Sequence, residues 1–114
     1  MNKLIIKRAD ARKVEIFIAG DIKTATSVCQ AYCDKVGLCV TVEPTNYIFT
    51  GGSEMGVRVG LINYARFPST RNQLWAKAED LANNMKAWMG QGSFTIQDDV
   101  ESVFYSTRDQ DQEQ

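Results

Sequence analysis

Residues 46–71 read NYIFTGGSEMGVRVGLINYARFPSTR, and this stretch decides the fold that we predict for the chain. Two apolar runs flank a glycine turn at 51–53, a pattern that predicts a β-hairpin. The second run ends before Pro68, and a capping box at 70–73 then predicts the start of a helix. The centre of the chain is therefore expected to be a strand–turn–strand–helix unit.

The residues before this unit predict two strands and a helix. A short apolar run at 4–6 predicts a strand that pairs, as a hairpin, with an alternating strand at 14–18. Asp21 has the chemistry of an N-cap, apolar residues then recur at helical spacing, and Gly37 suits the position after the helix. We therefore predict a helix over residues 22–36.

Extended segments lie on both sides of Pro44. Residues 38–42 alternate and predict a third strand that Pro44 interrupts, and the extended pattern resumes at 47–50. On the carboxyl side of the capping box, an apolar stripe runs from Leu74 to Trp88 and predicts a second helix. Two short strands at 93–97 and 102–106 should follow it.

These elements predict an α+β fold in a single domain over residues 1–107, with a polar C-terminal tail at 108–114. The expected order is ββα-ββα-ββ, with a mostly antiparallel sheet and two helices packed on one face. That arrangement buries the apolar stripes of both helices. The Trp- and Met-rich stripe of the second helix is wide enough to continue into a contact between subunits.

Composition excludes several classes of function. The net charge of −1 provides no basic field for DNA or RNA polymers, and no apolar run approaches the length of a membrane span. Histidine is absent, so the usual general base and zinc ligand are missing. We expect no cofactor, no metal site and no catalytic residues. Three cysteines and the lack of a signal peptide favour a reducing cytoplasm.

Some candidate sites have a simpler structural interpretation, which we favour. Cys29 and Cys33 are four residues apart on a predicted helix, and core packing explains them better than metal or redox chemistry. The glycine turn at 51–53 lacks the pattern of a phosphate-binding loop. Asp98 and Asp99 lie between two strands, as turn residues do.

The polar and aromatic residues after the central hairpin predict a ligand site. Asn63, Tyr64, Arg66 and Phe67 combine an amide, two aromatic rings and a planar cation. A guanidinium binds phosphate in bidentate fashion, and an aromatic ring stacks on a purine. A purely structural corner between strand and helix explains the same residues equally well.

Tyr105 and Arg108 repeat this combination near the end of the chain. A frayed terminus is the simpler interpretation of that segment. The residues alone leave both interpretations open.

Residues 3–109 resemble one protein family. The resemblance is carried by the sequence segments KRADARKVEIFIAGDI, KVGLCVTVEPTNYIFTGG, VGLINYARFPST, QGSFTIQ and FYSTRD. They are similar to the first family of Thoeris anti-defence proteins, which phages encode to sequester bacterial immune signals. The resemblance implies a non-enzymatic protein in the infected host's cytoplasm. It would bind cyclic ADP-ribose isomers, such as glycocyclic ADP-ribose, that TIR-domain enzymes make.

The resemblance also implies a homo-oligomer, a dimer or an assembly of dimers such as a hexamer. Some family members bind cyclic oligonucleotides at a second site between subunits. The resemblance places the ligand against the segments NYARFPS and FYSTRD. Arg66 and Arg108 would then meet the pyrophosphate, and Phe67 or Tyr105 the adenine. Asn63 and Asp109 would bond a base edge or a ribose hydroxyl.

Three hypotheses follow, in order of preference. The first is this signal-sequestering protein, with Arg58 and Arg71 as reserve phosphate ligands. The second is a small enzyme acting on the same nucleotides, with Glu54 or Asp109 as its base. The third is a protein–protein adaptor that uses the wide stripe of the second helix.

Overall fold

The computed structural model describes residues 1–112, which form five strands, two α-helices and one short 3-10 helix. Residues 113–114, at the end of the expected polar tail, lie outside the described part. The elements in chain order are β1 (Lys13–Ala19), α1 (Ile22–Val36), β2 (Thr41–Phe49), β3 (Gly52–Ile62), α2 (Arg71–Met89), β4 (Ser93–Gln97), β5 (Ser102–Ser106) and the 3-10 helix η1 (Asp109–Asp111).

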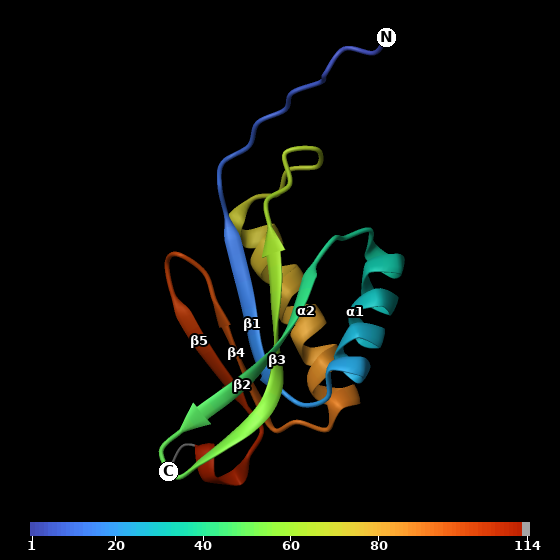
Figure 1. Cartoon of the computed structure of the whole chain (residues 1–114). Helices are drawn as coiled ribbons and strands as arrows, with labels where there is room; N and C mark the ends of the chain where they lie inside the picture. The colour runs from blue at the N-terminus through green and yellow to red at the C-terminus, as the bar shows by residue number, and fades with distance from the viewer. Residues whose placement is uncertain (113–114) are drawn as a thin grey trace.

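The five strands form one sheet in the order β2-β3-β1-β4-β5, and every neighbouring pair is antiparallel. Both helices pack against the same face of the sheet (Figure 1). Within residues 1–112, no helix covers the opposite face, which we call the open face. The predicted α+β class and the placement of both helices on one face are confirmed.

Alternation along the central strands builds the core. In β1 the buried residues are Val14, Ile16 and Ile18, and Ile16 lies directly opposite the buried Val59 of β3. Each helix adds an apolar stripe to the same layer, because its buried residues recur every three or four positions. The helical core residues are Ala25, Cys29, Tyr32, Leu74, Ala78, Leu81, Ala82 and Met85.

Both helices begin and end where their capping residues predict. The Asp21 carboxylate accepts a hydrogen bond from the Thr24 amide, and Gly37 follows the last turn of α1. At the start of α2, Thr70 and Gln73 form the predicted capping box, with side chain bonded to backbone in both directions. Gly90 follows the last turn of α2.

The predicted strand at 4–6 is wrong. Residues 1–12 form an extended arm without secondary structure, and the side chains of Leu4, Ile5 and Ile6 are exposed. Within residues 1–112 no strand pairs with this segment: β1, its predicted partner, pairs with β3 over Lys13–Ala19 and with β4 over Glu15–Phe17. The observed order is therefore β-α-ββ-α-ββ. The arm projects from the first residue of β1, away from the rest of the fold (Figure 1).

Pro44 does not interrupt the chain as predicted. It lies within the continuous strand β2, opposite Val57 of β3. Strand β2 is at the edge of the sheet, where a residue without an N–H group is tolerated because one side of the strand needs no hydrogen bonds. Sequence alone did not indicate that this strand would be at the edge.

Candidate ligand-binding site

The predicted site residues lie at two opposite ends of the sheet. The loop containing Asn63, Tyr64, Arg66 and Phe67 follows β3, whose last residue lies opposite the first residue of β1. Arg108 and Asp109 follow β5, whose last residue lies opposite the first residue of β4. Because β4 runs antiparallel to β1, these two places are at different ends of the sheet. One chain does not bring the two groups together.

Asn63 fastens parts of the fold to one another. Its side-chain Nδ2 donates to the Asp10 carbonyl at 2.8 Å, and its Oδ1 accepts from the Ser69 amide at 2.7 Å. Its backbone N–H donates to the Arg12 carbonyl. The amide thus holds the base of the N-terminal arm against the loop before α2. This use of the side chain supports the structural interpretation of residue 63.

The other residues of this loop are partly open to solvent. The Tyr64 hydroxyl donates to Cys39 Sγ at 3.1 Å, and the Tyr64 ring lies 5.4 Å from the Phe67 ring. Phe67 is 47% exposed, and Arg66 is exposed beside it. Two rings and a cation remain near one another, as predicted, but Tyr64, Arg66 and Phe67 do not line either of the two hollows described below.

Tyr105 faces the helices. Its ring stacks on Phe94 at 4.7 Å, and its hydroxyl donates to Glu79 at 2.6 Å and accepts from the Trp75 indole at 3.3 Å. Burial, and the hydrogen bond to Glu79, raise the pKa of Tyr105 to about 12. The ring is thus used in packing on the helix side of the sheet.

The two reserve arginines are occupied by carboxylates. Arg58 lies on the open face and pairs with Glu15 and Glu43, each at 3.3 Å. Arg71 pairs with Asp98 at 2.6 Å and with Glu101 at 3.3 Å. Asp98 is therefore more than the plain turn residue that the sequence indicated, because the Arg71 guanidinium lowers its pKa to about 2. The cationic charge of both arginines is offset within the fold.

A hollow of about 490 Å³ lies on the open face, near the end of β5. Ligand sites in proteins are generally between about 300 and 1,000 Å³. The β2–β3 hairpin swings across this end of the sheet toward β5 and forms one wall (Figure 1). The lining residues come from all five strands and the segments beside them: Phe17, Ile18, Ala19, Tyr47, Phe49, Glu54, Gln91, Ser93, Phe94, Thr95, Phe104 and Arg108.

Two side chains that line this hollow lie directly over glycine residues. The Tyr47 ring lies over Gly56, where a Cβ atom would be 2.5 Å from the ring and 2.5 Å from the Ile18 carbonyl oxygen. Tyr47 also donates its hydroxyl to the Val57 carbonyl at 2.6 Å, which fixes the ring against the sheet. The Arg108 side chain lies over Gly92 in the same way, with its Nε 2.6 Å from where a Cβ atom would be.

The hollow has the chemistry that the sequence predicted for a different place. Phe49 and Phe104 are 54% and 59% exposed, so their ring faces are accessible to a flat ligand. Arg108 forms no salt bridge with a carboxylate of residues 1–112, so its charge remains available for an anion. Glu54 adds an acceptor for N–H or O–H groups. Of these residues only Arg108 was among the predicted ligand contacts.

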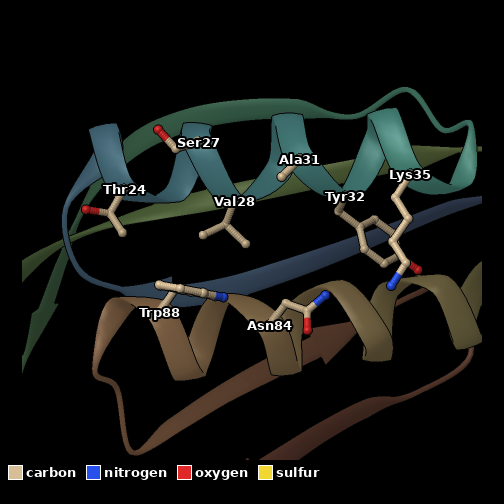
Figure 2. A pocket seen from close by; sticks show the side chains of 8 residues that line it. All are labelled: Thr24, Ser27, Val28, Ala31, Tyr32, Lys35, Asn84 and Trp88. Carbon is tan, nitrogen blue, oxygen red and sulfur yellow. The ribbon is translucent and has the colours of Figure 1, made fainter.

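A second hollow, of about 390 Å³, lies between the two helices (Figure 2). Val28 and Ala31 of α1 point into it, and Trp88 of α2, which is 76% exposed, lies at one end with Lys35 at the other. The remaining lining residues are Thr24, Ser27, Tyr32 and Asn84. This groove has one cation and one exposed indole, so it offers fewer groups for a nucleotide than the open-face hollow.

Cysteine and metal chemistry adds no further site within residues 1–112. Cys29 is buried among core residues, and burial raises the pKa of its thiol to about 11. No group of three or more Cys, Asp or Glu side chains in this part of the chain is placed to hold a metal ion. Neither α1 nor α2 is long and apolar enough to cross a membrane.

The fold is shared with known phage proteins. A phage SAM lyase in its apo state matches with a TM-score of 0.67 and 12% identity, over 93% of this chain and 98% of that chain. A phage SAM lyase in complex with S-methyl-5'-thioadenosine matches with a TM-score of 0.61 and 10% identity, over 93% and 97%. At this identity the similarity shows the fold alone. No protein-family model and no curated protein matches the sequence.

Proposed function

We propose that the protein binds a cyclic ADP-ribose isomer in the open-face hollow and sequesters it intact, as a phage anti-defence protein. The observation that carries this proposal is that accessible rings line the same hollow as a guanidinium that pairs with no carboxylate of residues 1–112. Phe49 and Phe104 offer ring faces for the adenine, and Arg108 offers a planar cation for the pyrophosphate. The resemblance of the sequence to Thoeris anti-defence proteins supports the choice of ligand.

The size and rigidity of the hollow support capture of a nucleotide. Its volume of about 490 Å³ suits a compact ligand such as a cyclic ADP-ribose isomer. Tyr47 and Arg108 are held against the backbone before any ligand arrives, so little conformational freedom is lost on binding. A preformed site of this kind favours tight and reversible binding.

Calorimetry with purified cyclic ADP-ribose isomers tests this proposal. We expect saturable binding at one site per chain, and ligand that is recovered chemically unchanged after the protein is denatured by heat. The same ligand, sequestered by the protein, should fail to activate a Thoeris effector in a coupled assay. Absence of binding to every isomer would refute the proposal.

A second candidate is an enzyme that breaks down S-adenosylmethionine or a related nucleoside. Two observations favour it: the fold is that of phage SAM lyases, and the carboxylate of Glu54 lines the same hollow. The adenine ring, which S-adenosylmethionine and cyclic ADP-ribose share, would stack on the same aromatic rings. Incubation with S-adenosylmethionine in molar excess distinguishes the two candidates. Product in excess of protein, lost in Glu54→Gln, would establish the enzyme.

A further inference from the structure

Residues 1–9 of the N-terminal arm carry apolar side chains that nothing else within residues 1–112 covers. Leu4, Ile5 and Ile6 are 86%, 79% and 63% exposed. The β-branched isoleucines favour an extended strand. An exposed apolar segment with free backbone N–H and C=O groups is a template for pairing with another chain. The arm therefore has the composition of a strand that lacks its partner.

The base of the arm is fixed, so the arm projects in a defined direction. Asn63 bonds the Asp10 carbonyl at 2.8 Å through its side chain and the Arg12 carbonyl at 3.0 Å through its backbone. The Arg12 guanidinium donates to the Ser69 carbonyl at 3.2 Å. These bonds direct residues 1–9 away from the body of the molecule, beyond the end of β1 (Figure 1).

The sheet has two edges that an added strand can extend, and they differ. Edge strand β2 contains Pro44, which has no N–H group to donate to a further strand. Edge strand β5 contains no proline. Its five residues span about 17 Å at roughly 3.3 Å per residue. Residues 3–8 of the arm are of similar length, so β5 is the better edge for pairing.

Charge favours the same pairing. Cations flank the apolar residues of the arm, with Lys3 before them and Lys7 and Arg8 after them. Carboxylates flank β5, with Asp99 in the turn before it and Asp109 in η1 after it. Arg108 lies between β5 and η1, but Asp109 and Asp111 outnumber it, and Asp99 and Glu101 precede the strand, so both ends of β5 carry an excess of negative charge. A second copy of the chain therefore provides an acidic counterpart to the basic ends of the arm.

We propose that the arm of one copy adds to the outer edge of β5 in a second copy, and extends its sheet by one strand. The alternation of a strand then places Leu4 and Ile6 on one face and Ile5 on the other. The added strand covers apolar side chains of the arm and bonds the free edge of β5. This assembly does not depend on which ligand the protein binds.

Photo-crosslinking tests which surface the arm contacts. Full-length protein with p-benzoylphenylalanine at Ile5 is prepared in ¹⁴N and ¹⁵N forms, mixed in equal amounts and irradiated. We expect crosslinked peptides of mixed isotopes that join the arm to residues 102–106. Crosslinks within one chain, between two arms, or to β2 or the helices would overturn the proposal, and so would a monomer without crosslinks.

A charge exchange tests the proposed complementarity by light scattering. The variant Lys3→Glu/Lys7→Glu should associate about tenfold more weakly, because both ends of the added strand become repulsive. Adding Asp99→Lys/Asp109→Lys should restore association, whereas Lys23→Glu/Lys77→Glu, with the same change in charge elsewhere, should not weaken it. Unchanged association of the first variant, or no restoration, would overturn the pairing with β5.

Discussion

The side chain of Arg108 lies across Gly92, with its Nε 2.6 Å and its Cγ 2.7 Å from the position that a Cβ atom would occupy. The neighbouring Thr107 fixes this contact by donating its backbone N–H to the Gly92 carbonyl at 2.9 Å. The Arg108 guanidinium of the open-face hollow therefore depends on a glycine that lies 16 positions earlier in the sequence.

Substitution Gly92→Ala should weaken ligand binding without unfolding the protein. The new methyl group displaces the Arg108 side chain, because the three nearest atoms all belong to that side chain and none to the backbone. Arg108→Ala should weaken binding at least as much, because a charge-assisted hydrogen bond is worth about 1.5–3 kcal/mol. Calorimetry measures both effects. Arg66→Ala, which removes an exposed arginine at the other end of the sheet, is the control, and an equal loss there would contradict this placement of the ligand.

Truncation of Phe104 should reduce affinity by about 1–3 kcal/mol if its ring stacks on the base. The side chain is 59% exposed, so the melting temperature should change little. Phe67→Ala is the matched control, since Phe67 is 47% exposed but lies outside the hollow. Equal affinities of the wild type and Phe104→Ala would rule out stacking at this ring.

The substitution Asn63→Asp should destabilise the fold by about 1–3 kcal/mol and leave ligand affinity unchanged. An aspartate can still accept from the Ser69 amide but cannot donate to the Asp10 carbonyl. Urea denaturation measures the stability, and calorimetry measures the affinity. Reduced affinity with full stability would instead make Asn63 a ligand contact, as the resemblance implied.

Stability should fall in acid through the Arg71–Asp98 pair. The guanidinium lowers the pKa of Asp98 to about 2, from an ordinary value of 3.8. The pair therefore contributes its full stability above the unfolded-state pKa, and that contribution is lost as the pH falls through about 2. Because Arg71 is 35% exposed, we expect only about 1–2 kcal/mol. Asp98→Asn should remove this part of the dependence in denaturation experiments between pH 5 and 2.

Truncation of a core residue should lower stability and leave ligand affinity unchanged, the reverse of what is expected for the binding variants. Leu81 is fully buried between α2 and the sheet, so Leu81→Ala should cost about 2–5 kcal/mol of stability. The hollow does not include this residue, so the affinity of the folded fraction should be retained. A stable Leu81→Ala protein with impaired binding would contradict the placement of both core and site.

Local signals in the sequence predicted most of the elements. The caps at Asp21 and Thr70 fixed the starts of both helices, because side-chain hydrogen bonds at a helix end depend on neighbouring residues only. The strand at 4–6 failed because a strand needs a partner, and the apolar pattern of Leu4 to Ile6 does not reveal whether one exists in the same chain.

The proposed site was harder to predict because sheet order brings distant segments together. Tyr47 and Phe104 line one hollow although 57 positions separate them in the sequence. The available signal was the opposite face of the strand alternation: Phe17 and Phe104 occupy positions that point away from the buried residues of β1 and β4. Aromatic residues at solvent-facing positions of a strand indicate the open-face hollow, whereas the cluster in the loop after β3 does not.

The most direct measurement is a titration of isotope-labelled protein with a cyclic ADP-ribose isomer, followed by chemical-shift mapping. Binding in the open-face hollow predicts the largest shifts at Phe17, Phe104 and Arg108, with the ligand unchanged at the end. Shifts confined to residues 63–67 or to the groove beside Trp88, or none at saturating ligand, would contradict it.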